Sequence, residues 1–274
     1  MALTLDGDLV LAGAGNMGGA MLTGWLAGGL DPKRIVVQDP SPSPAVAALL
    51  AKHGITAHST MPDRGRPPSV LLMAVKPQVM DEVFPPLAKR AGPGTLVLSI
   101  AAGKTIASFE RHLAPGIAVV RSIPNTPAAV GRGITVAAPN QHVTPAHRAL
   151  CDALLGAIGE VGWVDDEALI DPVTAVSGSG PAYVFYLTEC LAAAGVKAGI
   201  SPELAMRLAR ATVAGSGELM RQSELGPDQL RKNVTSPNGT TYAALQVLMS
   251  DKGLEPLMTE AIAAATRRSR ELAS

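Results

Sequence analysis

The segment TSPNGTT, residues 235–241, holds four hydroxyl side chains, an amide, a proline and a glycine, and it carries no formal charge. Pro237 and Gly239 predict a tight loop, and Thr240 and Thr241 stand where the next helix begins, with free backbone N–H groups and hydroxyls. Such a helix start can bind a carboxylate without an arginine, and a threonine hydroxyl can hydrogen-bond an imine or amine nitrogen. A plain turn with an N-cap is the alternative, although four hydroxyls exceed what capping needs.

A second chemical pattern is GAGNMG, residues 13–18, which fits G-x-G-x-x-G, follows a short apolar strand and opens a helix. This context favours a dinucleotide-binding turn over a plain glycine turn. Gly13 permits the tight turn, Gly15 lets the backbone approach a pyrophosphate, and Gly18 lets helix and strand pack closely. The amides at the helix start then face the phosphates.

An acidic residue, Asp39, closes the second expected strand, 21 residues after Gly18. A carboxylate at this place accepts hydrogen bonds from a ribose 2′-hydroxyl and repels a 2′-phosphate, so it favours NADH over NADPH. Ser41 and Ser43 follow and can donate to a phosphate, which keeps NADPH open. Asp39 can also be an ordinary turn residue before Pro40.

Two further segments, AVKPQ (74–78) and SIAAGK (99–104), follow apolar strands. Ligands bind at the carboxyl ends of strands in open α/β sheets. Lys76 can therefore contact a phosphate or the nicotinamide ribose, or it can be a solvated loop lysine. The small residues of the second segment allow a ligand to come close.

The usual catalytic side chains are missing from the second half of the chain. All five histidines precede residue 150 and are interpreted as surface or loop residues. No Ser-His-Asp order, Cys-His pair or metal-ligand spacing stands out, so no metal is expected. Oxidising an alcohol with a nicotinamide cofactor needs a base, whereas a cyclic imine arrives protonated and needs positioning and a hydrogen bond at its nitrogen. The lack of histidines after residue 150 therefore favours reduction of an imine over oxidation of an alcohol.

The elements that must position these residues alternate along the first part of the chain. The expected strands are 9–12, 35–39, 69–75, 95–100, 117–123, 133–138 and 160–164; the expected helices are 17–28, 43–52, 78–90, 104–113 and one that starts at Pro145 after the N-cap Thr144. Strands without polar alternation, separated by helices, predict a parallel sheet covered on both faces.

From about residue 166 onward the strands stop. The helix expected over 180–199 is apolar almost all round, so it must be buried in a core or against a partner subunit. Gly215-Ser216-Gly217 lowers helix propensity, which indicates that another backbone packs close to it. A linker is expected at 164–172, and it divides the chain into a dinucleotide-binding domain, 1–164, and a helical substrate and dimerisation domain, 165–274.

Bulk composition excludes several classes of protein. Of the 274 residues, 47% are hydrophobic and 17% charged, with 23 basic and 23 acidic side chains, so a disordered or nucleic-acid-binding protein is disfavoured. Cys151 and Cys190 are expected to be reduced, mostly buried thiols. No signal peptide and no membrane span are expected, which predicts a cytoplasmic protein.

The segment LRKNVTSPNGTTYAALQVL is similar to the signature segment of the pyrroline-5-carboxylate reductase family. GAGNMGGAM resembles that family's nucleotide turn, AVKPQ its second cofactor loop, RSIPNTPAAVGRGIT the segment after its sixth strand, and TAVSGSGPAYVFYLTECLAAAGVKAGI its first long helix. The matches follow the right order along nearly the whole chain. The resemblance implies an α/β N-terminal Rossmann-type domain with a doubly wound sheet, then an all-α C-terminal dimerisation domain whose helices interlock between subunits.

The resemblance also implies roles for individual residues. Thr241 would be the catalytic, substrate-binding hydroxyl that bonds the ring nitrogen, and Ser236, Gly239 and Thr240 would hold the substrate carboxylate. The cofactor-binding candidates, with the acidic residue discussed above, are Gly13, Ala14, Gly15, Asn16, Met17, Gly18, Asp39, Ala74, Val75, Lys76, Pro77, Ala101 and Ala102. Two positions depart from the family: Asn238 replaces a common glycine, and Asp39 stands where many members have neutral or basic residues. The acidic residue at position 39 favours NADH as the cofactor, whereas members of the family usually prefer NADPH.

The expected function is NAD(P)H-dependent reduction of 1-pyrroline-5-carboxylate to L-proline, the last step of proline synthesis. The expected assembly is a homodimer through the C-terminal helices, which in the family often builds rings of dimers. The alternatives are a reductase for another cyclic imine, a small hydroxyacid dehydrogenase, and a non-catalytic dinucleotide sensor or scaffold.

Overall fold

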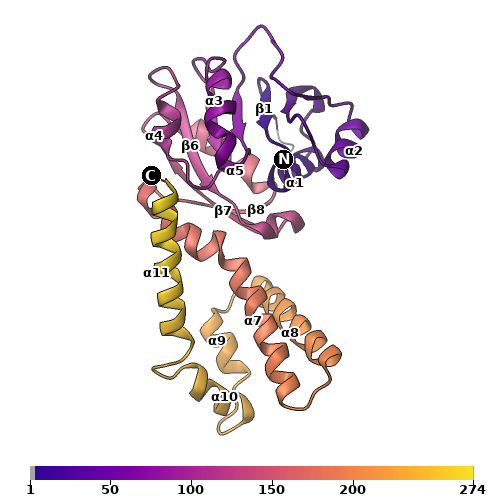
Figure 1. The fold of residues 1–274 in the computed structure, drawn as a ribbon, viewed down its shortest axis with the longest axis vertical. Coiled ribbons are helices and arrows are strands. Elements are labelled where there is room, and N and C mark those ends of the chain that lie inside the picture. The colour runs from indigo at the N-terminus through magenta and orange to yellow at the C-terminus, as the bar shows by residue number, and fades with distance from the viewer. Residues whose placement is uncertain (1–3, 274) are drawn as a thin grey trace. The chain divides into compact units, whose positions relative to one another are not determined.

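The chain forms two compact units. The computed structural model describes residues 4–273. One unit comprises the chain up to residue 178 together with residues from 265 onward, and the other comprises 179–264. The first unit contains the sheet and the second is helical (Figure 1).

Within the described residues, the first unit is built on a single eight-stranded sheet in the order β3-β2-β1-β4-β5-β6-β7-β8. The strands are β1 (Leu9–Ala12), β2 (Ile35–Gln38), β3 (Ala57–His58), β4 (Val70–Met73), β5 (Leu96–Ser99), β6 (Ala118–Ile123), β7 (Gly133–Pro139) and β8 (Gly159–Trp163). Seven of these were expected from the sequence, and the two-residue β3 was missed. Neighbours among β1 to β6 run parallel, as predicted.

The parallel prediction is wrong for one pair, because β7 runs antiparallel to β6, and β8 is parallel to β7. Residues 124–132 join β6 to β7 and contain only the 3-10 helix η3 (Thr126–Val130). A parallel return needs a crossover of a dozen or more residues, usually with an α-helix. The connection is too short for that.

Helices cover both faces of the sheet. They are α1 (Asn16–Ala27), η1 (Pro32–Arg34), α2 (Pro44–Lys52), η2 (Pro77–Val79), α3 (Met80–Ala88), α4 (Ile106–Glu110) and α5 (Pro145–Gly156). Leu9 and Leu11 of β1 belong to the apolar cluster that α1, α2 and α5 cover, whereas Val10 and Ala12 belong to the one that α3 and α4 cover. Alternate residues of one strand thus point into two cores, which confirms the doubly wound arrangement.

The segment 164–172, expected to be a linker, is packed onto the sheet unit. It contains η4 (Glu167–Leu169) and α6 (Ile170–Val173) and continues into the π-helical turn η5 (Thr174–Gly178). Ile170 is fully buried and packs with Ile123 and Ala138. The compact unit therefore extends to residue 178. The functional boundary at 164/165 stays a prediction.

The second unit consists of α7 (Gly180–Lys197), α8 (Pro202–Gln222), α9 (Pro227–Asn233), α10 (Thr240–Leu248) and the first part of α11 (Leu254–Ala273), whose last turns belong to the sheet unit. On α7, Phe185 is 62% exposed and Tyr186 is 66% exposed. The option that this helix is buried in the chain's own core is therefore wrong, and the option of a partner subunit remains. Of the described helices, none is long and apolar enough to cross a membrane.

Candidate active site

The predicted cofactor-binding residues meet at one edge of the sheet. The glycine turn follows β1, Asp39 follows β2, residues 74–77 follow β4, and Ala101 and Ala102 follow β5. These four strands are adjacent and parallel, in the order β2-β1-β4-β5. Their carboxyl ends therefore share one edge, which is where open α/β sheets bind ligands.

The glycine turn has the geometry that a pyrophosphate requires. Gly13 has a φ of 89°, and a Cβ there would lie 2.8 Å from the backbone of Ala74. A Cβ on Gly15 would have no atom within 4 Å, so the space above it is open. Helix α1 begins at Asn16 without a side-chain cap, which leaves its first N–H groups for a ligand. The turn fits a dinucleotide.

Asp39 is bonded to the glycine turn itself. Its Oδ2 accepts a hydrogen bond from Ala14 N–H at 2.8 Å, and its Oδ1 accepts one from Ser41 N–H at 2.9 Å. Both carboxylate oxygens are thereby held beside the turn, so the negative charge has a fixed position. Ser43 accepts from Val46 N–H as the N-cap of α2, and the side chains of Ser41 and Ser43 are both exposed.

The loops after β4 and β5 complete this edge. Val75 and Pro77 are half-buried, and Lys76 is exposed at the N-cap of η2. Ala101 is buried, with its N–H donated to the Ser99 hydroxyl at 3.2 Å, while Ala102 is exposed. The structure therefore brings the cofactor candidates together on three loops and the end of β2.

The hydroxyl-rich loop 235–241 lies in the helical unit, between α9 and α10. Gly239 N–H donates to the Ser236 carbonyl at 3.1 Å, and a Cβ on Gly239 would collide with the Ser236 hydroxyl. Asn238 has a φ of 55°, in the left-handed region that asparagine tolerates. Asparagine in place of the family's common glycine therefore still adopts a left-handed backbone conformation at this position.

Helix α10 begins without any hydroxyl cap. Its N-cap is Gly239, and no side chain bonds to the first N–H groups. Within the described part of the chain, the hydroxyls of Thr240 and Thr241 have no hydrogen-bond partner. Thr241 is half-buried, and Ser236 and Thr240 are exposed. The interpretation of these hydroxyls as helix caps is therefore wrong, and they remain available to a ligand.

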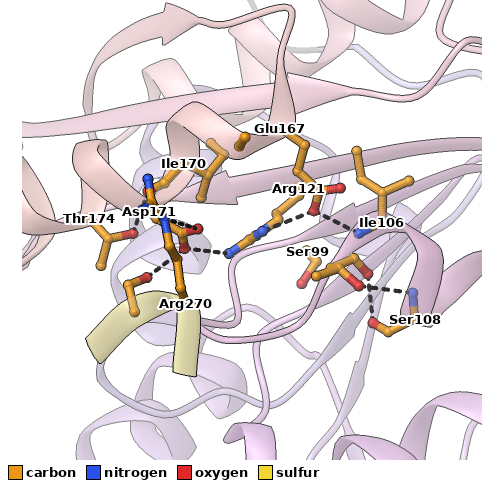
Figure 2. A network of polar contacts seen from close by, with 12 residues as sticks. Ser99, Ile106, Ser108, Arg121, Glu167, Ile170, Asp171, Thr174 and Arg270 are labelled. Carbon is orange, nitrogen blue, oxygen red and sulfur yellow. Dashed lines mark hydrogen bonds and ion pairs between the residues drawn. The ribbon is translucent and has the colours of Figure 1, made fainter. Parts of the chain in front are cut away.

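A charged network near β5 was not predicted. Arg121, whose side chain is 3% exposed on β6, donates from Nη1 to Glu167 Oε1 at 2.9 Å and lies 3.8 Å from Asp171 Oδ1 through Nη2 (Figure 2). Glu167 Oε1 also accepts from Ile106 N–H at 2.8 Å. The sequence signal was a lone arginine inside the apolar run IAVVRSI, because a buried charge requires partners.

Other reactive groups do not form a second site. Burial raises the pKa of the Cys151 thiol to about 12, which makes it a poor nucleophile. Cys190 is exposed on α7, so the expectation of two mostly buried thiols is wrong for this residue. In residues 4–273, no group of three His, Cys, Asp or Glu side chains is placed to hold a metal ion.

Two family models match the chain. One, described as pyrroline-5-carboxylate reductase dimerisation, matches residues 167–272. The other, described as NADP oxidoreductase coenzyme F420-dependent, matches residues 9–103, which contain the glycine turn. The first begins at η4, so it includes the segment that packs onto the sheet unit.

Whole-chain comparisons agree with these matches. The pyrroline-5-carboxylate reductase of Pseudomonas aeruginosa is 40% identical over 97% of this chain and 96% of its own length. The solved structure of a pyrroline-5-carboxylate reductase from Coxiella burnetii is 34% identical, has a TM-score of 0.90 and covers 98% of this chain and all of its own. A Plasmodium falciparum pyrroline carboxylate reductase with NADP bound is 28% identical, with a TM-score of 0.77 over 98% of this chain and 99% of its own. The chain belongs to the pyrroline-5-carboxylate reductase family.

Proposed function

We propose that the chain is a pyrroline-5-carboxylate reductase, which reduces the C=N bond of 1-pyrroline-5-carboxylate with NAD(P)H and forms L-proline. Family membership supports the reaction class. The observation that carries the proposal is the start of α10, where an uncharged loop offers uncapped N–H groups and two unpartnered threonine hydroxyls. These groups suit a small carboxylate that bears a ring nitrogen.

The protein's task in this reaction is to position rather than to exchange protons. The cyclic imine is basic enough to arrive protonated, and its charged C=N bond accepts a hydride, which the nicotinamide supplies when bound. Ser236, Gly239 and Thr240 hold the carboxylate, and the Thr241 hydroxyl bonds the ring nitrogen. No general base is required.

The cofactor is NAD(P)H, and we infer a preference for NADH. Asp39 keeps its carboxylate fixed between Ala14 N–H and Ser41 N–H, where it can accept from a ribose 2′-hydroxyl. The chain has no lysine or arginine from residue 40 to residue 51, so no cation in this stretch compensates a 2′-phosphate. The Plasmodium falciparum relative was solved with NADP bound, so NADPH stays the alternative cofactor.

The chain forms homo-oligomers, since it carries the family's dimerisation domain. We infer that α7 and α8 form the dimer contact, because Phe185 and Tyr186 are exposed and a Cβ on Gly215 or Gly217 would have no atom within 4 Å in its own chain. The backbone that is expected to pack closely against Gly215 and Gly217 then belongs to a second copy of the chain. We further propose that the dimers assemble into a ring and that the protein is cytoplasmic. We also propose that the boundary between the dinucleotide-binding domain and the helical domain lies at 164/165.

A steady-state assay tests the function. The purified chain should oxidise NADH with 1-pyrroline-5-carboxylate faster than with other cyclic imines, and proline should accumulate in equal amount. Reduction of NAD⁺ with hydroxyacids would favour the dehydrogenase alternative instead. Cofactor binding without turnover across the panel of imines would favour a sensor or scaffold.

A further inference from the structure

The loop of residues 100–105, which joins β5 to α4 and contains Ala101 and Ala102, is held from three directions. Lys104 Nζ pairs with Asp81 of α3 at 2.8 Å. Gly103, with a φ of 72°, lies so close to the last turn of α11 that a Cβ would sit 2.9 Å from the Leu272 carbonyl oxygen. Both contacts belong to the sheet unit.

The third support comes through the end of the loop. Ile106 is the first residue of α4, and its N–H donates to Glu167 Oε1 at 2.8 Å. The same oxygen accepts from Arg121, so the helix start and the buried guanidinium share one acceptor. A displacement of the Arg121 or Glu167 side chain therefore changes the hydrogen bond that holds the backbone N–H of Ile106, at the end of the loop.

The last turns of α11 bind to the other side of this network. The Ser269 hydroxyl donates to Asp171 Oδ1 at 2.7 Å, and Arg270 Nε lies 3.9 Å from Asp171 Oδ2. Figure 2 shows Arg121 between Glu167 and Asp171, with Arg270 beyond Asp171. The charges of Arg121 and Arg270 face those of Glu167 and Asp171, and each carboxylate also accepts a hydrogen bond. Arg121 and Asp171 are the buried members of this set, and a buried ion requires partners.

We propose that the end of α11 is a buttress for the cofactor loop, and that Asp171 and Ser269 are positioning residues for dinucleotide binding. The inference rests on the proposed function, because it takes Ala101 and Ala102 as part of the dinucleotide site. Asp171 and Ser269 act through Arg121, Glu167 and the backbone of residue 106. The expected defect is therefore weaker cofactor binding with unchanged recognition of the imine.

Ser269→Ala in the full chain is the first test, with Ser269→Thr as the rescue and Arg268→Ala as the matched control. Arg268 pairs with Glu271 on the exposed side of the same turn, outside the network. Titration with NADH should show a dissociation constant that is about three- to tenfold higher for Ser269→Ala than for the wild type, which is the effect of one lost hydrogen bond. Ser269→Thr and Arg268→Ala should bind NADH with dissociation constants near that of the wild type. KM for the imine and oligomeric mass should stay unchanged, and the melting temperature of Ser269→Ala should fall by about 2–4 °C, the scale of one hydrogen bond.

Hydrogen exchange supplies a readout that needs no turnover. The peptide containing the amide of residue 106 should exchange faster in Ser269→Ala and at the wild-type rate in Arg268→Ala. If Ser269→Ala does not fold, Arg270→Gln, at a side chain that is 63% exposed, loosens the same helix end from Asp171. Unchanged NADH affinity and unchanged exchange in the folded variant overturn the buttress.

The two proposals fail in different ways. A wild-type chain that binds NADH but does not reduce the imine contradicts the proposed function and leaves the comparison of variants valid. A wild-type chain that reduces the imine, with variants that bind NADH equally well, contradicts the buttress alone. A wild-type chain that binds neither NADH nor NADPH overturns both.

Discussion

At the residue level, the start of α10 offers the Thr240 and Thr241 hydroxyls, which have no hydrogen-bond partner within residues 4–273, and N–H groups that no side chain caps. The loop 235–241 has no charge, and α10 starts at a glycine, which has no side chain to cap the first N–H groups of the helix. A carboxylate bound at this helix start gains from several free N–H groups at once. In the proposed mechanism, the Thr241 hydroxyl makes the remaining hydrogen bond, to the ring nitrogen.

Thr241→Ala should lower turnover of 1-pyrroline-5-carboxylate roughly ten- to a hundredfold. The variant loses one hydrogen bond to the imine nitrogen, worth about 1–3 kcal/mol if the partner is left buried. Thr241→Ser should retain most of the activity, and Thr259→Ala, which removes a hydroxyl bonded within its own helix, should retain all of it. Initial rates of NADH oxidation decide the matter, and equal rates for all three variants would remove Thr241 from the mechanism.

Asp39→Asn should raise the ratio of kcat/KM for NADPH to that for NADH about tenfold. The substitution removes the charge that opposes a 2′-phosphate, a repulsion of about 1 kcal/mol or more at contact distance, and it keeps an oxygen for Ala14 N–H. Asp39→Ala should show the same shift with weaker binding of both cofactors, since the turn loses its anchor. A ratio that does not move in either variant would show that Asp39 does not select the cofactor.

The candidate site residues were predicted from local sequence signals, and their roles stay predictions. The glycine turn, Asp39 and Thr241 carry their signals within a few neighbouring residues. The bond from Ala14 N–H to Asp39 was not predictable, because it joins positions 25 residues apart. The partners of Arg121 were hidden for the same reason: they lie 46 and 50 residues further along the chain and sit in a segment that was interpreted as a linker.

At the level of secondary structure, the strand order brings the loops after β1, β4 and β5 to one edge of the sheet. The charged network of Arg121 and Glu167 bonds the end of the loop after β5. The apolar pattern located the buried strands β1, β2, β4, β5 and β6, and it also located β7 and β8, which are only partly buried. It could not show that β7 reverses, since direction depends on the length of the connection rather than on the strand itself. It also missed β3, which is only two residues long.

Arg121→Met should destabilise the fold by on the order of 3–5 kcal/mol. Removing the guanidinium leaves Glu167 and Asp171 facing each other's charge in a largely buried place, and an unmatched buried ion is expensive. Chemical denaturation of the sheet unit, followed by the fluorescence of the buried Trp25, measures the loss. The control is Arg90→Met, at a surface pair with Asp63, which should unfold near the wild-type midpoint. A wild-type midpoint for Arg121→Met would show that the network does not stabilise the sheet unit.

At the scale of the whole molecule, the helical unit is built for a partner. Apolar side chains remain exposed on α7 and α8, among them Phe185, Tyr186, Leu208 and Leu219. Exposed apolar surface of this kind marks an interaction site. The sequence predicted that α7 needs burial, because it is apolar almost all round, but hydrophobic pattern alone could not choose between a core and a second subunit.

Phe185→Glu should shift the chain from its oligomer toward monomer. A charge placed in an apolar contact loses its water without gaining a partner. Light scattering coupled to gel filtration measures the mass, and Ala51→Glu on the exposed end of α2 is the control, because it also adds one negative charge but in the sheet unit. If Phe185→Glu keeps the wild-type mass, α7 does not form the contact.

The central claim is that a hydride passes from the cofactor to the imine carbon. The most direct measurement supplies NADH that carries deuterium at the transferable position, together with 1-pyrroline-5-carboxylate, and analyses the product by mass spectrometry. The expected product is L-proline heavier by a single deuterium, located on the ring carbon that was double-bonded to nitrogen, with one NADH oxidised per proline formed. Proline without the label, or NADH oxidation without proline, would contradict it.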